Sequence, residues 1–294
     1  MSTSDPLKFL FVINPISGGK VKDNRENTIR TYFANVPHTA EVFLLDGKND
    51  AASLDYWIER IKPNRIVAVG GDGTVNLVAK KIMGTTMSMG IIPAGSANGL
   101  ATELGIPAKT DDALEIIING KIKELDVVKI NDEAISLHLA DVGLNAQLIK
   151  YFEESNWRGK LGYAKVLLKT LWNKQKLTVE IETPEQKISR KAFMVVLANS
   201  RTYGTGAVIN PDGDPSDGKF EIVIVRRLAL SELLKMIVFH KPFNPKKVEV
   251  IRTRSVIIKT KKKTYVQADG EYLGKQKFIK ATMAPEKINI VLSA

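Results

Sequence analysis

The residue best suited to chemistry in this chain is Asp72, whose carboxylate lies within the sequence Gly-Gly-Asp-Gly at 70–73. The mostly apolar run at 65–69 is typical of a buried strand, and a helical pattern begins at Thr74. Glycines let a backbone approach a ligand closely or adopt positive φ, and a helix start presents N–H groups that suit phosphate. Asp72 would hold a divalent cation beside the phosphates or take a proton from an attacking hydroxyl. Alone, these residues fit a tight turn with a solvated aspartate equally well.

Two further segments share this design. The apolar run at 9–13 leads into Asn-Pro-Ile-Ser-Gly at 14–18, and the run at 89–92 leads into Pro-Ala-Gly-Ser-Ala-Asn-Gly at 93–99. In an open parallel α/β sheet, such loops gather at the carboxyl edge of the strands, where ligands bind. We therefore expect one phosphate-binding site. Its expected nucleotide-binding residues are Asn14, Pro15, Ser17, Gly18, Gly70, Gly71, Asp72, Gly73, Thr74, Asn76, Gly95, Ser96 and Asn98.

The three loops also carry a family resemblance. In this order and spacing, NPISGGK at 14–20, GGDGTVN at 70–76 and PAGSANGLATELGIP at 93–107 resemble the diacylglycerol kinase catalytic domain. That superfamily includes soluble bacterial lipid kinases, sphingosine kinases and ceramide kinases, and the resemblance covers almost the whole chain. It implies an ATP-dependent, Mg²⁺-requiring kinase that phosphorylates a hydroxyl of diacylglycerol, a sphingoid base or a related lipid in a cleft between two domains.

Asp269-Gly270-Glu271 is the second candidate catalytic element. From the residues alone it is an ordinary Asp-Gly β-turn. The resemblance implies that a carboxylate here acts as general base on the lipid hydroxyl, because phosphoryl transfer otherwise consists mostly of positioning and charge neutralisation. The catalytic candidates are therefore Asp269 and Glu271, with Asp72 as the rival base or the ligand of the nucleotide-bound Mg²⁺.

Two more sites follow from the resemblance. Asp141 matches an aspartate that contacts the polar head of the lipid in sphingosine kinases. The loop at 210–220 is rich in carboxylates, whose oxygens suit Mg²⁺ or Ca²⁺. By itself it is a solvated loop. Bacterial relatives bind a structural magnesium at the matching turn, which implies Asp217 as a side-chain ligand and Asp214 and Lys219 as backbone ligands.

The chain departs from the bacterial pattern at two places. Bacterial diacylglycerol kinases carry Gly-Thr-x-Asn-Asp in the third loop, whereas this chain has Gly-Ser-Ala-Asn-Gly at 95–99 and so lacks one carboxylate. The third loop looks more like the sphingosine and ceramide branch. Leu45, followed by Asp46, stands where bacterial relatives usually have threonine. Both departures bear on which substrate is bound and on how the phosphates are positioned.

Other motifs are excluded by their spacing. Gly-Gly-Lys at 18–20 is no P-loop, because Asn14 replaces the first glycine and Val21 follows the lysine. There is no G-x-S-x-G elbow, and the three histidines lack metal-ligand spacing. Two alternatives stay open. One is an NAD kinase-like activity, which shares the Gly-Gly-Asp-Gly turn, and the other is a protein that senses nucleotide or lipid with little or no turnover.

Composition predicts a protein with an anionic partner. The chain has 294 residues, 44% of them hydrophobic, which suggests about two domains with ample core. No apolar run reaches the roughly 18 residues that span a bilayer, and no cysteine is present for disulfides or thiolate metal sites. With a net charge of +11, we expect a cytoplasmic protein in peripheral contact with the anionic inner face of a membrane, for example through Lys261-Lys262-Lys263. No nucleic acid is expected, and a homodimer is left open.

The order of patterns predicts two domains. Residues 1–125 alternate strand and helix, which predicts an α/β domain with a parallel sheet and helices on both faces. Residues 126–294 predict a mainly antiparallel β-sandwich that holds the lipid, with the last strand free to return to the first domain. Helical insertions are expected at 146–172 and 229–239. The strands expected in the second half are 125–130, 134–142, 177–181, 191–198, 220–225, 248–252, 255–260, 264–268 and 287–292.

Overall fold

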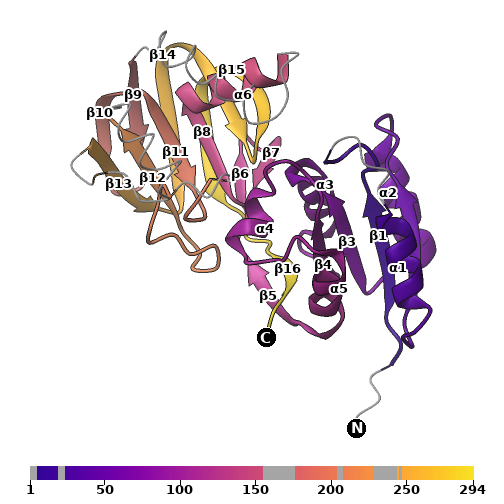
Figure 1. Ribbon diagram of the computed structural model, residues 1–294. Helices are drawn as coiled ribbons and strands as arrows, with labels where there is room; N and C mark the ends of the chain where they lie inside the picture. The colour runs from indigo at the N-terminus through magenta and orange to yellow at the C-terminus, as the bar shows by residue number, and fades with distance from the viewer. Residues whose placement is uncertain (1–4, 19–23, 155–175, 204–207, 228–243, 245–246) are drawn as a thin grey trace. The chain divides into compact units, whose positions relative to one another are not determined.

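The computed structural model describes residues 5–18, 24–154, 176–203, 208–227, 244 and 247–294 (Figure 1). The chain divides into two compact units. Unit 1 comprises residues 1–125 together with 286–294, and unit 2 comprises residues 126–285.

Unit 1 is built on a six-stranded sheet in the order β2-β1-β3-β4-β16-β5. The first five strands are parallel, and only β5 runs antiparallel to its neighbour β16. The last strand of the sequence therefore completes the sheet of the first unit. The strands are β1 Lys8–Ile13, β2 Thr39–Leu44, β3 Arg65–Gly70, β4 Ser88–Pro93, β5 Lys121–Leu125 and β16 Ile288–Leu292.

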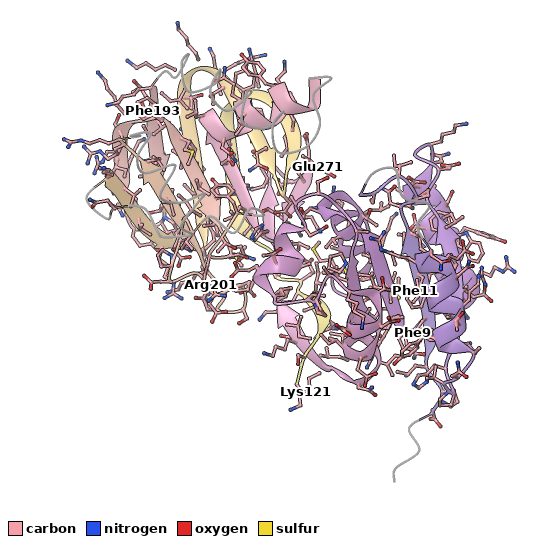
Figure 2. All side chains as sticks on the ribbon, viewed as in Figure 1. Phe9, Phe11, Lys121, Phe193, Arg201 and Glu271 are labelled. Carbon is pink, nitrogen blue, oxygen red and sulfur yellow. The ribbon has the colours of Figure 1, made fainter. Side chains whose placement is uncertain are left out.

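Helices cover both faces of this sheet. On one face, Phe9 and Phe11 of β1 pack in a buried cluster with Phe33 of α1 and Leu114 of α5. The aromatic rings of Phe9 and Phe11, both labelled in Figure 2, meet Phe33 edge-on. Alternate residues of β1 such as Leu10 are equally buried and point to the other face, where α2 and α3 contact the strands. The helices are α1 Arg25–Phe33, α2 Asp50–Ile61, α3 Asp72–Ile82, α4 Gly99–Glu103 and α5 Thr110–Asn119.

Unit 2 is an antiparallel β-sandwich, so the predicted fold class is confirmed for both halves of the chain. Strand β14 joins its two layers, because residues 257–260 pair with β9 and residues 266–268 pair with β8. Helix α6 packs on β8, β14 and β15. The elements are β6 Val128–Ile130, β7 Ala134–Ser136, β8 Leu139–Gly143, α6 Leu144–Glu154, β9 Leu177–Glu182, β10 Lys187–Ala192, β11 Met194–Ala198, β12 Phe220–Val225, β13 Val248–Thr253, β14 Ser255–Ala268 and β15 Glu271–Met283.

Some expected boundaries are wrong. No strand was expected at 271–283, yet β15 has 13 residues there and pairs along most of β14. The expected strands 255–260 and 264–268 are one strand with shifts in register. Helix α6 begins at Leu144 rather than 146. Residues 155–175 and 228–243, which include the rest of that helical insertion and the whole of the second, lie outside the described residues.

Within the described residues, no helix combines the length and the apolar character needed to cross a membrane. Two lysines of β15 have partners in unit 2. Lys280 pairs with Asp132 at 3.4 Å, and the Lys275 ammonium lies 4.5 Å from the centre of the Tyr265 ring. The three lysines at 261–263 are exposed on β14.

Candidate active site

The three glycine-containing loops converge at one edge of the sheet in unit 1. Because β1, β3 and β4 are parallel neighbours, their carboxyl ends lie side by side. Backbone hydrogen bonds continue this pairing past the strands. The amide N–H of Asn14 donates to the carbonyl of Val69 at 2.9 Å, and that of Ala94 donates to the carbonyl of Gly70 at 2.8 Å. The expected convergence of the loops is therefore present.

Glycine is needed in these loops for close approach. A Cβ on Gly71 would lie 3.2 Å from the Cα of Gly95, and one on Gly95 would lie 2.5 Å from the Cα of Gly71. A Cβ on Gly18 would lie 2.6 Å from the carbonyl oxygen of Ala94. Among the loop glycines that the structure describes, positive φ, which the sequence left open, occurs only at Gly18, at +82°. The loops thus touch one another backbone to backbone.

Asp72 links the second loop to the third. It occupies the first turn of α3, which begins two residues earlier than predicted. Its carboxylate accepts hydrogen bonds from the backbone N–H of Gly99 at 3.0 Å and of Leu100 at 3.3 Å. These are the first residues of α4, whose N–H groups have no partner within the helix itself. Asp72 therefore holds the start of α4 against the start of α3.

The other loop residues divide by burial. Asn98 has a left-handed backbone, and its side-chain amide both accepts from Gly95 N–H at 2.7 Å and donates to the Gly95 carbonyl at 2.9 Å. The Asn14 side chain accepts from the N–H of Ile16 at 3.1 Å. Both residues shape their loops. Thr74 and Asn76 are buried, and the residues that remain at least partly exposed are Pro15, Ser17, Gly18, Gly71, Gly73, Gly95 and Ser96.

In unit 2, Asp269 and Gly270 form the tight turn between β14 and β15, both with positive φ. The Asp269 carboxylate accepts four hydrogen bonds of 2.7–3.1 Å, one from the hydroxyl of Ser136 and three from backbone N–H groups at 137–139. These bonds explain why the expected single strand 134–142 is broken into β7 and β8. Asp269 thus anchors the turn to a segment about 130 residues earlier in the chain.

Glu271 is the first residue of β15 and is exposed (Figure 2). The turn before it is fixed from a second side, because the N–H of Gly270 donates to the side-chain carbonyl of Gln267 at 2.8 Å. The amide nitrogen of Gln267 donates in turn to the Oδ2 atom of Asp141. A chain of hydrogen bonds therefore connects the strand residue Asp141 to the turn that carries Glu271.

Asp141 is completely buried on β8. Its Oδ2 atom also accepts from the side-chain amide of Asn145 at 2.5 Å, whereas its Oδ1 atom has no hydrogen-bond partner. Burial raises the pKa of Asp141 from 3.8 to about 6, and the hydrogen bonds from Asn145 and Gln267 oppose this rise. The structure gives Asp141 partners inside the core of unit 2, and its contact with a lipid head group stays a prediction.

The loop expected to hold a structural magnesium is held by other bonds. Asp217 accepts from the N–H of Lys219 at 2.9 Å through one oxygen and pairs with the guanidinium of Arg252 through the other. Asp214 accepts from the N–H and hydroxyl of Ser216 at 3.0 and 2.6 Å. In the part of the chain that the structure describes, no three of Asp, Glu and His gather to hold a metal ion. Arg252 supplies positive charge at Asp217 in this structure, and the magnesium site with Asp214 and Lys219 as backbone ligands stays a prediction.

Sequence reasoning missed the residues that position the candidates. Gln267, Asn145 and Ser136 fix the turn and its neighbour Asp141 by hydrogen bonds, and Arg252 pairs with Asp217. Asn145 lies four residues after Asp141, but across the junction of β8 and α6, where this spacing does not by itself indicate contact. The other contacts join distant parts of the chain.

Two family models match this chain. The model described as "Diacylglycerol kinase catalytic domain" matches residues 8–130, and the model described as "YegS C-terminal NAD kinase beta sandwich-like domain" matches residues 139–292. The second match covers more than half of the chain. Together the two matches include the three loops of unit 1 and nearly all of unit 2.

The curated relatives are about 30% identical to this chain over part of its length. The protein named "Probable lipid kinase YegS-like" of Pectobacterium atrosepticum is 30% identical over 182 residues, which is 60% of this chain and 60% of that protein. The protein of the same name from Yersinia enterocolitica is 29% identical over 195 residues, or 64% of each. The chain thus covers a little under two thirds of the length of these relatives.

Solved structures show the same fold over nearly the whole chain. A diacylglycerol kinase from Bacillus anthracis str. Sterne superposes with a TM-score of 0.74 at 19% identity, covering 99% of this chain and 98% of that one. An NAD kinase from Archaeoglobus fulgidus in complex with ATP superposes with a TM-score of 0.57 at 14% identity, covering 96% and 93%. At these identities, the likeness concerns the fold.

Proposed function

Because the chain belongs to the family of YegS-like lipid kinases with a diacylglycerol kinase catalytic domain, we propose that it transfers the γ-phosphoryl group of ATP to a hydroxyl group of a lipid such as diacylglycerol or a sphingoid base. The observation that carries this proposal is the convergence of three loops in unit 1. They meet at the Gly71–Gly95 and Gly18–Ala94 contacts, at the carboxyl edge of a parallel sheet.

The loops have the chemistry that nucleotide phosphates require. Helix α3 begins at Asp72 and α4 begins at Gly99, so two helix starts lie next to each other. Phosphate oxygens would accept from exposed backbone N–H groups of the loops and from the Ser96 hydroxyl. Asp72 is the one carboxylate within the three loops, and it would hold a Mg²⁺ ion that neutralises charge on the phosphates.

We assign the general base to Glu271 among the three candidates. The Asp269 carboxylate is committed to four hydrogen bonds that hold the turn, and Asp72 is committed to the start of α4. A carboxylate whose lone pairs accept backbone N–H groups is a poor proton acceptor, because protonation would break those bonds. Glu271 is exposed beside the anchored turn, so its carboxylate can reach a lipid hydroxyl.

The decisive experiment replaces this carboxylate. We expect Glu271→Gln to lower kcat by roughly 10²- to 10⁴-fold while ATP affinity and thermal stability stay unchanged. The matched control is Glu185→Gln, since Glu185 is also an exposed glutamate of unit 2. Activity is measured with labelled ATP and a panel of diacylglycerol, sphingosine, ceramide and phosphatidylglycerol. If Glu271→Gln is fully active, another residue is the general base. If the wild-type protein transfers phosphate to none of the lipids, the proposed function is wrong.

NAD is included in the panel as the second candidate acceptor. The fold likeness to an NAD kinase in complex with ATP favours testing it, and that kinase shares the two-unit architecture over 96% of this chain. Transfer to NAD but to no lipid would favour the NAD kinase activity. Binding of labelled ATP without transfer to any acceptor would instead favour a sensor.

A further inference from the structure

Two edge strands of the sandwich in unit 2, β10 and β13, contact each other through their side chains. Among the described strands, β10 pairs only with β9, and β13 pairs only with β12. Arg190 of β10 and Glu249 of β13 join these edges by two hydrogen bonds of 2.8 Å between the guanidinium and the carboxylate. The seam between the edges is thus bridged by an ion pair.

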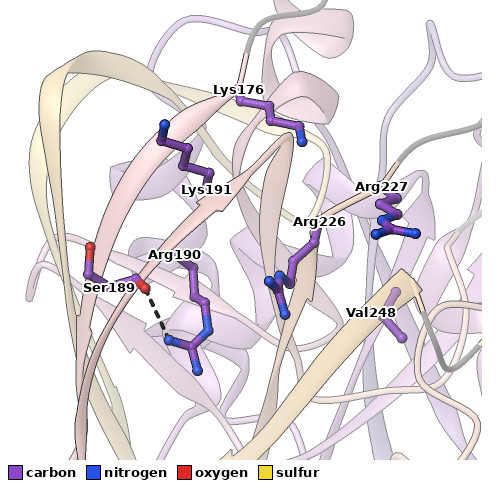
Figure 3. A pocket seen from close by; sticks show the side chains of 7 residues that line it. All are labelled: Lys176, Ser189, Arg190, Lys191, Arg226, Arg227 and Val248. Atoms are coloured by element: carbon purple, nitrogen blue, oxygen red, sulfur yellow. Dashed lines mark hydrogen bonds between the residues drawn. The ribbon is translucent and has the colours of Figure 1, made fainter.

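A cavity of about 700 Å³ lies at this seam. Figure 3 shows the side chains that line it, which come from four separate segments of unit 2. Five of the lining residues are cations, and Ser189 adds a hydroxyl group. The five cations are Lys176, Arg190, Lys191, Arg226 and Arg227.

Contacts within the fold hold the backbone at Arg226 and Arg227 and the side chains of Lys176 and Arg190. The backbone N–H groups of Arg226 and Arg227 both donate to the carbonyl of Lys247, at 3.2 and 3.4 Å, which fixes the chain as it leaves β12. The ammonium of Lys176 lies 5.4 Å from the centre of the Phe193 ring, a distance typical of a cation–π contact. Arg190 is oriented by its bonds to Glu249.

The positive charge of the cavity exceeds the negative charge of Glu249, the carboxylate that pairs with its arginines. Among the residues that the structure describes, Glu249 is the carboxylate that pairs with these cations, at 2.8 Å from Arg190 and 3.7 Å from Arg226. These described residues together carry a formal excess of four positive charges. The hydrogen bonds from Arg190 lower the pKa of Glu249 and keep it ionised, so that acid is already engaged with Arg190. The remaining cations repel one another unless an anion lies between them.

Protection of sheet edges does not explain this arrangement. Charged residues on edge strands commonly prevent two sheets from pairing, and Lys191 on β10 fits that role. Lys176 precedes β9, however, and Arg226 and Arg227 follow β12, and both β9 and β12 are paired on two sides. These three cations are therefore not edge residues, although they line the same cavity.

We propose that this cavity binds a phosphate-bearing anion, either free or as the head group of an anionic phospholipid. Guanidinium groups donate in a planar fork that matches phosphate oxygens, and ammonium and hydroxyl groups complete such a site. All residues that line the site belong to unit 2. It does not depend on the proposed kinase activity.

The test compares two variants that each lose two positive charges from unit 2. The site variant is Lys191→Gln with Arg226→Gln, which leaves the Arg190–Glu249 pair intact. The matched control is Lys259→Gln on β14 with Lys277→Gln on β15, where both lysines are exposed. Binding of labelled inorganic phosphate is measured by equilibrium dialysis at fixed ionic strength. Binding of vesicles is measured by sedimentation, with phosphatidylcholine alone or mixed with phosphatidylglycerol.

We expect the site variant to lose phosphate affinity roughly tenfold or more and the control to retain it. If inorganic phosphate also displaces wild-type protein from phosphatidylglycerol vesicles, the ligand is a lipid head group. If vesicle binding is the same in wild type and site variant, the ligand is free phosphate. Equal losses of phosphate binding in both variants would reduce the effect to net charge and overturn the proposal, as would unchanged phosphate binding in the site variant.

Discussion

The buried carboxylate of Asp141 makes the stability of unit 2 depend on pH. Its pKa rises to about 6 from an ordinary 3.8 because burial disfavours the charged form. The folded state therefore binds this proton more tightly than the unfolded state. The resulting stabilisation is fully present below pH 3.8 and is lost as the pH rises through about 6.

The size of the effect follows from the two pKa values. A rise from 3.8 to about 6 corresponds to about 3 kcal/mol between the low-pH and high-pH limits. Between pH 8 and pH 5, linkage gives about 1.4 kcal/mol, or about tenfold in the unfolding equilibrium. Asp141→Asn cannot titrate. Its amide would replace a buried carboxylate that accepts hydrogen bonds, which costs about 1–3 kcal/mol at every pH.

The wild-type protein should therefore gain stability over Asp141→Asn as the pH falls. We would measure hydrogen–deuterium exchange of peptides from β8 and β11 in both proteins and take the ratio of rates at each pH, so that intrinsic exchange rates cancel. The ratio of variant to wild-type rates should rise about tenfold from pH 8 to pH 5. The control is Asp132→Asn, whose side chain is 69% exposed, and its ratio should stay constant. A change of less than about twofold for Asp141→Asn would refute the reasoning.

Three further predictions concern the turn at Asp269, the loops of unit 1 and the exposed lysines of β14. Asp269→Asn should lower the stability of unit 2 by about 1–3 kcal/mol, because its amide would face backbone N–H donors; unchanged melting by calorimetry would contradict this anchoring role. Gly71→Val should abolish ATP binding by forcing apart the loops that meet at Gly95, and an unchanged ATP affinity by calorimetric titration would remove the loop assignment. Reversing the charges at 261–263 should weaken activity on vesicle-borne lipid in a salt-sensitive way but spare a short-chain soluble analogue, whereas equal losses on both substrates would end the membrane interpretation.

The first unit could be predicted from the sequence because its signals are local. Apolar runs followed at once by small-residue loops mark β1, β3 and β4, and parallel order then brings the loops to one edge. What local patterns could not provide is the contact between loops. The need for glycine at Gly71 arises from the distance to Gly95, and that distance depends on the pairing of β3 with β4.

The second unit was predicted less completely because distant pairing decides its strands. Strand β15 carries the polar run Gly274-Lys275-Gln276-Lys277 between its apolar residues Leu273 and Phe278, so its own residues give little strand signal. It forms because β14 and β6 supply partners on both sides. The break between β7 and β8 likewise depends on Asp269, about 130 residues away.

Asp72 and Asp269 share a role that affects how activity data must be interpreted. Each lies beside glycine, Asp72 in the first turn of α3 and Asp269 in the turn before β15, and each carboxylate binds backbone N–H groups at the beginning of another element. Replacing either residue removes acceptors from buried or partly buried donors, so activity would fall through loss of geometry even if neither residue exchanges a proton with substrate. Glu271 differs, because its side chain is exposed and it lies after the turn. A loss of kcat at full stability therefore identifies the base only at Glu271, whereas at the two aspartates the loss has to be compared with the change in stability before any chemical role is assigned.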